Sequence, residues 1–175
     1  MIISVEELRQ HVTTDKTDSE LEMMLQALEQ AIRKYTNNNF QHTGYRREAD
    51  IVGGCLIVES VNPFAVGDTV QISESQFSNG IYTVALSEDS VLALNESVPD
   101  EDRVLLTKVV YPADVKMGAV NMLKWDLENR GKVGIQSETI SRHSVTYFNM
   151  DGANSVIGYP KSLLGFLKPY RKARF

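Results

Sequence analysis

The sequence predicts an α+β protein: a small helical bundle of about four helices, with a small all-β, barrel-like unit inserted between the second and third helices. Two observations lead to this prediction. Apolar residues recur at helical spacing in the first 44 residues and again after residue 111, whereas short β-branched runs alternate with turn residues in between. We therefore expect a helical body formed by residues 1–44 and 112–175 and an all-β insertion at residues 45–111.

The composition of the 175 residues is that of a soluble globular protein, with 42% hydrophobic and 23% charged residues. No run approaches the roughly 20 apolar residues that a membrane-spanning helix needs, and the first ten residues lack the features of a signal peptide. We therefore expect a product of the cytoplasm that does not contact a membrane. The net charge of −5 argues against a general nucleic-acid binder, which normally carries a strongly basic face.

A capping-box pattern predicts the first helix. Ser4 and Glu7 are spaced so that each side chain can accept a free backbone N–H of the first turn. A short helix at residues 5–11 should follow, with Leu8 and Val12 turned inward.

The second helix is predicted by the same pattern at Thr17 and Glu20, and the asparagines at 37–39 should end it. Glu29 and Arg33 are spaced to pair on its outer side. Its apolar stripe consists of Leu21, Met24, Leu25, Leu28, Ala31, Ile32 and Tyr35.

Turn residues separate several short apolar runs in the central part of the chain. Gly53-Gly54 fits a hairpin turn, and Gly67-Asp68 and Asn79-Gly80 precede two further runs. Strands of this length with turn residues between them indicate a small sheet or barrel. The expected strands are residues 51–52, 56–58, 69–72, 81–84, 91–94 and 103–110.

A third helix should run from Pro112 to Asn129, since proline suits the first turn of a helix. Its apolar arc is wide, and such a helix is usually covered on more than one side. Residues 129–131 should end it in the left-handed conformation, where Arg130 and Lys132 are favoured by the helix dipole. The arc includes Val115, Met117, Ala119, Val120, Met122, Leu123, Trp125 and Leu127.

Residues 133–148 are rich in serine, threonine and aromatic residues, which favours an extended segment. We expect an exposed arm or hairpin that is available to a neighbouring subunit. A short last helix at residues 161–167 should begin at Pro160 and stop at Pro169. The residues after it, 170–175, should be loosely held unless a partner fixes them.

The sequence contains no pattern typical of catalysis or metal binding. The three histidines, His11, His42 and His143, lack the spacing of metal ligands. Cys55 is the only cysteine, which excludes an intrachain disulfide, and its apolar neighbours predict a buried, inert thiol. The acidic residues at 96–102 should form a solvated loop. We therefore predict that the protein is not an enzyme and holds no cofactor or metal.

Two regions resemble the head–tail connector (adaptor, or head-completion) proteins of tailed double-stranded DNA phages and prophages. Residues 5–40 have the short helix, acidic turn and long helix ending in tyrosine and phenylalanine that are typical of this family. Residues 134–147, GIQSETISRHSVTY, resemble the family segment G-(V/I)-x-S-E-x-(I/V) followed by S-V-x-Y. The chain departs from the family at Ser141-Arg142, where many members carry a glycine, and in its β unit, which the smallest members lack.

The resemblance implies a non-enzymatic virion protein of the neck. Copies of such proteins assemble as a ring, commonly of about twelve, on the portal protein at the capsid vertex. The ring extends the DNA channel and binds the next neck or tail-completion protein, with DNA only as passing cargo. The residues expected at the portal or subunit interface are Trp125, Ile135, Ser137, Glu138, Tyr147, Lys168, Tyr170, Arg171, Lys172 and Arg174.

Two other functions compete with this one. The first is a nucleic-acid-binding module, in which the β unit is an OB- or SH3-like barrel and the basic C-terminal tail contacts phosphates. The second is a hydrolase that uses the acidic loop and a histidine, which would require distant residues to converge.

Overall fold

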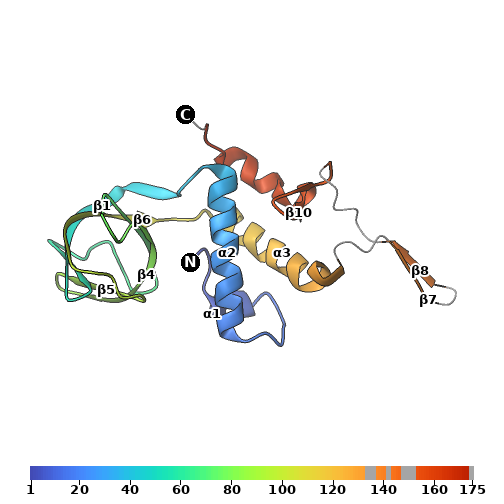
Figure 1. Ribbon diagram of the computed structural model, residues 1–175, viewed down its shortest axis with the longest axis horizontal. Helices are drawn as coiled ribbons and strands as arrows, with labels where there is room; N and C mark the ends of the chain where they lie inside the picture. The colour runs from blue at the N-terminus through green and yellow to red at the C-terminus, as the bar shows by residue number, and fades with distance from the viewer. Residues whose placement is uncertain (133–136, 141–142, 147–152, 174–175) are drawn as a thin grey trace. The chain divides into compact units, whose positions relative to one another are not determined.

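The computed structural model describes residues 1–132, 137–140, 143–146 and 153–173 of the chain (Figure 1). Contacts divide the chain into two compact units. The barrel unit comprises Met1–Ser4 and Asn39–Tyr111, and the helical unit comprises Val5–Asn38 and Pro112–Phe175. The protein is therefore a mixed α and β structure, as its sequence predicts.

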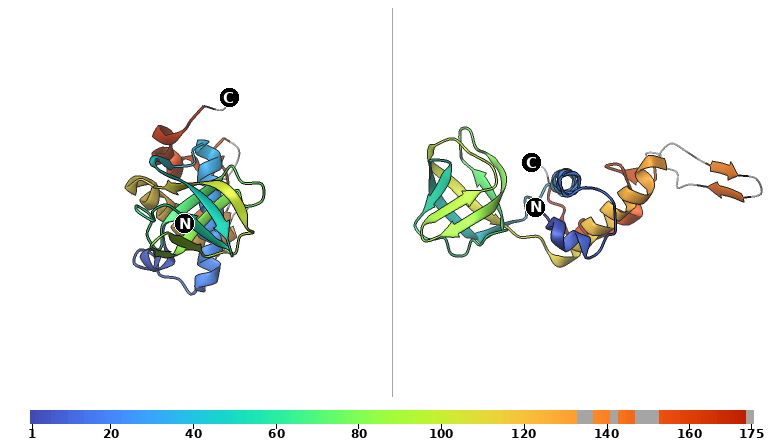
Figure 2. Two further views of the ribbon diagram at one scale, coloured as in Figure 1. Left: turned by 90° about the vertical axis from the view of Figure 1, so that its left-hand side faces the viewer. Right: turned by 90° about the horizontal axis from the view of Figure 1, so that it is seen from below.

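Six antiparallel strands close into a barrel (Figures 1 and 2). The pairing of the strands gives the order β1-β2-β5-β4-β3-β6. The prediction of a small barrel is thus confirmed. The strands are β1 (Gln41–Val52), β2 (Cys55–Val58), β3 (Thr69–Ser73), β4 (Gly80–Glu88), β5 (Val91–Leu94) and β6 (Glu101–Val109).

The turn between β1 and β2 is the two-residue hairpin that the sequence predicts. Val52 pairs with Cys55, so Gly53 and Gly54 form the loop, with φ values of 61° and 77°. Two consecutive positive φ values are typical of the type I′ turn, which glycine adopts at low steric cost. β1 itself begins at Gln41, well before the expected strand at residues 51–52, because its exposed polar first half has no apolar alternation to reveal it.

All six strands contribute apolar side chains to the barrel interior, as expected for a small barrel whose core is filled. Phe64 and Val98, from the connecting loops, complete this core. Its strand residues are Ala49, Ile51, Leu56, Val58, Val70, Ile72, Val84, Leu92, Leu94, Val104 and Leu106. Cys55 is half-buried and not fully buried as predicted, because the alternation of β2 turns its neighbour Leu56 into the core instead.

In the helical unit, helix α3 packs against α2 and against the 3₁₀ helix η2 (Figure 1). Lys116 of α3 also reaches Glu7 of α1 at 4.0 Å. The helices of the helical unit are α1 (Val5–Arg9), α2 (Asp18–Thr36), α3 (Ala113–Asn129), η1 (Arg130–Lys132) and η2 (Lys161–Tyr170). Its short strands are β7 (Ser137–Ile140), β8 (His143–Thr146), β9 (Ser155–Val156) and β10 (Tyr159–Pro160).

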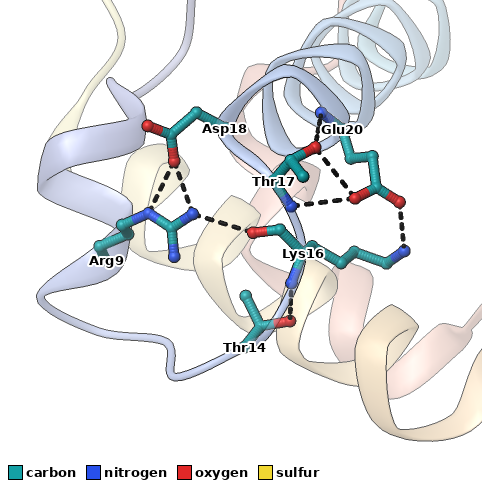
Figure 3. A network of polar contacts seen from close by, with 6 residues as sticks. All are labelled: Arg9, Thr14, Lys16, Thr17, Asp18 and Glu20. Carbon is teal, nitrogen blue, oxygen red and sulfur yellow. Dashed lines mark hydrogen bonds and ion pairs between the residues drawn. The ribbon is translucent and has the colours of Figure 1, made fainter.

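Helix α2 begins at the predicted capping box (Figure 3). The Thr17 hydroxyl accepts the Glu20 N–H at 3.3 Å, and the Glu20 carboxylate accepts the Thr17 N–H at 2.9 Å. The helix ends at Asn37, whose φ of 49° is left-handed, also as predicted. The placement of Glu29 and Arg33 on the outer side was wrong, since both side chains are buried, with 4% and 7% exposed.

Helix α1 ends at Arg9, two residues before the predicted end, while Leu8 and Val12 are buried as expected. The predicted left-handed end of α3 was also wrong. Arg130 is right-handed, with φ −59°, and the chain continues as the 3₁₀ turn η1 through Gly131. Met117 is 46% exposed, so the wide apolar arc of α3 is only partly covered within the chain.

The last helix is a 3₁₀ helix that passes through Pro169 instead of stopping there. A proline near the end of such a helix is tolerated because it removes only one backbone N–H, and the turn closes with Arg171 N–H donating to the Lys168 carbonyl at 3.4 Å. Leu164 and Leu167 are buried, as predicted, and Leu163 is half-buried.

Within the predicted extended segment, β7 and β8 pair as an antiparallel hairpin, with Ser137 opposite Thr146 and Ile140 opposite His143. This agrees with the expected hairpin for the part that the structure describes. The predicted exposure of this hairpin stays a prediction.

Candidate functional site

The C-terminal segment after η2 is fixed to the end of α2. The Lys172 N–H donates to the Thr36 carbonyl at 2.8 Å, and the Asn37 side-chain amide donates to the Ala173 carbonyl at 2.8 Å. These bonds correct the expectation that residues 170–173 are loosely held. The Asn37 amide is available for this contact because the left-handed cap ends the helix at that residue.

Tyr170 joins the same segment to the first turn of α3. Its hydroxyl donates to the Asp114 carboxylate, at 2.8 and 2.9 Å from the two oxygens. The hydrogen bond to this carboxylate raises the pKa of Tyr170 above its ordinary value. Its carbonyl accepts the Asn38 side-chain amide at 3.1 Å. Tyr170 therefore connects three parts of the helical unit: the C-terminal segment, the first turn of α3 and the end of α2.

A pocket of about 560 Å³ lies beside this segment. Among the described residues, its lining includes Lys34, Arg171 and Lys172 and no Asp or Glu, and the Arg171 guanidinium lies over the Tyr35 ring, 5.2 Å from its centroid. We call this site the basic pocket. It is lined by Lys34, Tyr35, Asn37, Ile157, Arg171, Lys172 and Ala173.

Ile157 supplies an apolar wall of the basic pocket in an unusual backbone conformation. It lies with Gly158 in the two-residue turn between β9 and β10, and its φ is 48°. A β-branched residue with positive φ is strained, and such strain concentrates at functional sites. Its side chain is nevertheless 41% exposed. The strain is therefore not the by-product of burying an apolar side chain.

The two units differ in charge, which sets the electrostatic environment of the pocket. The barrel unit carries eleven carboxylate and four Lys or Arg side chains, a net charge of −7. The helical unit carries twelve and fourteen, a net charge of +2. A concave site lined by cations on the more positive unit favours an anionic or acidic partner.

No family model matches the sequence, and no curated protein matches it. The basic pocket must therefore be interpreted from its own chemistry. Three cations around an aromatic ring and an aliphatic side chain can bind carboxylates or phosphates together with an apolar or aromatic group.

The structure brings two of the predicted interface residues together, since Arg171 and Lys172 both line the basic pocket. Tyr170 precedes them but binds Asp114, and Lys168 is exposed on η2. The other predicted residues lie elsewhere: Ser137 and Glu138 are on β7, and Ile135, Tyr147 and Arg174 are outside the described residues.

Trp125 lies in a separate cluster at the end of α3. Its ring is 5.7 Å from that of Tyr159, and the Arg130 guanidinium lies over both rings, 5.2 and 4.9 Å from their centroids. The Tyr159 hydroxyl donates to Asp126, and burial together with this bond raises the pKa of Tyr159. Trp125 is therefore half-buried within its own chain, and its predicted interface role remains a prediction.

Sequence reasoning missed Lys34, Tyr35, Asn37 and Ile157 as pocket residues. Lys34 and Asn37 carried a signal for the helix end but none for the C-terminal segment that returns to it. For Ile157 the signal was the Ile-Gly pair before Tyr159, since a glycine in a short turn suggests positive φ at its neighbour too.

The residues considered for catalysis are dispersed over the described structure. His42 is stacked on Tyr45, with centroids 4.1 Å apart, and His11 is exposed. Asp100 accepts the Gly54 N–H at 3.2 Å. Among the residues that the structure describes, no group of three His, Cys, Asp or Glu side chains could hold a metal ion, and no helix could cross a membrane.

Proposed function

We propose that the protein is a non-enzymatic neck component of a tailed phage or prophage, a ring on the portal that connects the DNA-filled head to the tail. The observation that carries this proposal is the basic pocket, where Arg171 and Lys172 of the C-terminal segment are fixed beside Tyr35. A preorganised site binds a partner with less loss of conformational entropy than a loose tail.

The charge distribution supports the same role. A barrel unit with a net charge of −7 repels the phosphate backbone, which suits a conduit through which DNA must pass without being held. The basic pocket on the helical unit offers a contact for acidic side chains of the portal or of a neighbouring copy.

The decisive experiment is co-sedimentation of the purified protein with portal-bearing capsids of the same phage. We expect the wild-type protein to bind, and Lys172→Glu to weaken binding by about tenfold or more because it places a negative charge in the pocket. The Lys172 N–H bond to Thr36 involves only the backbone, so the segment should stay in place.

Lys124→Glu is the matched control, because it makes the same charge change at a lysine of α3 that does not line the pocket. It should bind as the wild type does. A wild-type protein that never binds portal-bearing capsids would refute the proposed function, and equal effects of the two variants would refute the role of the pocket.

One feature favours the second candidate function, nucleic-acid binding. His42 and Tyr45 are stacked at an interplanar angle of 17° on the exposed half of β1, immediately before Arg46 and Arg47. Stacked aromatic and arginine side chains are typical of surfaces that bind single-stranded nucleic acid. Fluorescence anisotropy with a labelled single-stranded oligonucleotide tests this. Salt-sensitive binding that Tyr45→Ala abolishes would support it over the connector.

A further inference from the structure

The loop between β3 and β4, residues 74–79, displays a large aromatic side chain. Phe77 is 73% exposed, although an aromatic ring gains more free energy from burial than most side chains. An exposed aromatic residue on a fixed loop is the usual form of an interface anchor, whereas one on a disordered loop loses the advantage to conformational entropy.

This loop is fixed by hydrogen bonds centred on Ser75. The buried Ser75 hydroxyl donates to the Glu101 carboxylate at 2.6 Å and accepts the N–H groups of Phe77 and Ser78 at 3.1 and 2.6 Å. The Ser75 N–H donates to the Asn79 side chain at 3.1 Å. The loop therefore holds its conformation while it presents Phe77.

Acidic residues lie in and next to the loop. Glu74 begins the loop, and Glu101 supports it by accepting the Gln76 N–H as well as the Ser75 hydroxyl. Asp102, next to Glu101, is exposed. The hydrogen bonds from Ser75 and Gln76 lower the pKa of Glu101, so this carboxylate is negatively charged at neutral pH. The loop is thus an apolar anchor in acidic surroundings.

The basic pocket has the complementary chemistry. The Tyr35 ring and Ile157 offer apolar surface, and Lys34, Arg171 and Lys172 surround it with positive charge. An aromatic ring among ammonium and guanidinium groups gains cation–π attraction, and carboxylates beside it can pair with the same cations.

We propose that the loop at residues 74–79 of one copy docks into the basic pocket of a second copy, with Phe77 as the anchor. The loop belongs to the barrel unit and the pocket to the helical unit, so the contact joins two different surfaces. A head-to-tail contact of this kind leaves a loop and a pocket unused at the two ends of every open assembly. Repetition therefore produces a closed ring, in which every loop and pocket is used, or an open filament. For its biological setting the proposal rests on the proposed ring function.

The strained turn at Ile157 fits this proposal. Asn-Gly would adopt the two positive φ values more readily than Ile-Gly. Isoleucine at this position is therefore less stabilising than asparagine, but it provides the pocket with an apolar wall. Ile157→Asn should raise the melting temperature of the helical unit and yet weaken self-association, a combination that a purely structural role for Ile157 does not produce.

The test uses two complementary variants of the full chain. Phe77→Ala removes the anchor, and Arg171→Glu with Lys172→Glu reverses charge in the pocket. Sedimentation velocity at chain concentrations up to about 1 mM, where contacts worth roughly 4 kcal/mol are populated, should show association of the wild type that weakens as salt is raised. Each variant alone should be a monomer over the same range.

An equimolar mixture of the two variants should form heterodimers and nothing larger. Only one intact loop and one intact pocket then remain, on different chains. A wild type that stays monomeric, variants that associate like the wild type, or a mixture that stays monomeric would each overturn the proposal. Circular dichroism of each variant checks that it is folded.

A cross-link identifies the contact. Phe77→p-benzoylphenylalanine, irradiated in a mixture of ¹⁴N- and ¹⁵N-labelled chains, should give mixed-isotope peptides that contain Tyr35 or Arg171. Cross-links only within one chain, or to other peptides, would contradict docking between copies.

The outcomes also separate this inference from the proposed function. If the wild-type protein associates with itself but does not bind capsids, only the connector role is refuted. Capsid binding by an assembly that Phe77→Ala does not disturb would refute only the docking of the loop.

Discussion

The barrel unit and the helical unit are stabilised in different ways. In the barrel, apolar side chains from all six strands fill one interior, so stability is distributed over many similar contacts. The helical unit also buries apolar side chains, such as Leu21, Val115 and Leu164. In addition, particular contacts join its segments, such as the close approach of η2 to Gly118 of α3 and the hydrogen bonds that fix residues 170–173. We therefore expect the two units to tolerate substitutions at different kinds of position.

The chain supplies one natural probe for each unit. Trp125, the only tryptophan, lies in α3, and Cys55, the only cysteine, lies half-buried in β2. Tryptophan fluorescence therefore follows unfolding of the helical unit. Because the Cys55 thiol is partly covered in the folded barrel, the rate at which a thiol reagent labels it rises when the barrel opens. Together the two probes show whether a substitution acts on one unit or on both.

The largest effect is expected from Leu106→Ala in β6. Leu106 is fully buried in the barrel core, and removing such a side chain typically lowers the free energy of unfolding by about 2–5 kcal/mol through lost burial and the cavity left behind. Labelling of Cys55 should become much faster. If the units unfold separately, the fluorescence transition of Trp125 should stay where it is in the wild type.

Leu86→Ala is the control for this prediction, since Leu86 lies in β4 of the same barrel but is 39% exposed. It should change the labelling rate only slightly. Equal effects of the two substitutions would mean that the core does not carry the stability of the barrel.

A smaller effect is expected from Gly118→Ala, in the middle of α3. A Cβ atom at this position would lie 2.2 Å from the Phe166 ring of η2, so the ring must shift or the two helices must move apart. Such overpacking costs about 1–3 kcal/mol, against a gain of about 1 kcal/mol in helix propensity. We expect a lower midpoint of the Trp125 fluorescence transition and an unchanged rate of Cys55 labelling.

Gly165→Ala is the matched control, because a Cβ atom at that position of η2 meets nothing within 4 Å. Its effect should stay within about 0.5 kcal/mol. A Gly118→Ala protein as stable as this control would show that α3 and η2 do not depend on close approach at Gly118.

Much of the barrel could be predicted from the sequence, because its signals are local. Gly53-Gly54 fixes a turn by its own backbone freedom, and β-branched runs such as the one at β3 favour extended structure wherever they occur. The early start of β1 could not be predicted, since the strand is held there by pairing with β6 and not by its own apolar pattern.

The helical unit was harder to predict where distant segments meet. Glu29 and Arg33 fit an exposed pair by spacing alone, and only the packed structure shows them to be buried. The glycine at 118 was a visible signal, because an interior helix glycine usually has a packing reason, but the partner Phe166 is 48 residues away.

The candidate site shows the same limit. The basic residues Arg171 and Lys172 were predicted to lie at an interface from their charge, which is a local property. The pocket that they form with Lys34 depends on a segment that returns to a helix more than 130 residues earlier in the chain. Spacing in the sequence carries no information on such a return.

The smallest of these effects concerns the capping box of α2 (Figure 3), and it would show how far a single polar contact stabilises the helical unit. Thr17→Ala removes the hydroxyl that accepts the Glu20 N–H and should lower the free energy of unfolding by about 1 kcal/mol. Thr17→Ser keeps a hydroxyl at this position and should be close to the wild type. If the alanine and serine variants unfold at the same denaturant concentration, the cap contributes nothing measurable.

The same cap predicts a pH dependence. The Thr17 N–H, followed by Lys16, lowers the pKa of Glu20 from 4.5 to about 2. A carboxyl group whose pKa is lower in the folded state stabilises that state above the unfolded pKa, and this contribution is lost as the pH falls from about 4.5 to about 2. Glu20→Gln keeps a capping acceptor but cannot titrate. The Trp125 unfolding midpoint of this variant should therefore fall less steeply over that range than the midpoint of the wild type, and identical pH profiles would contradict the assignment of Glu20.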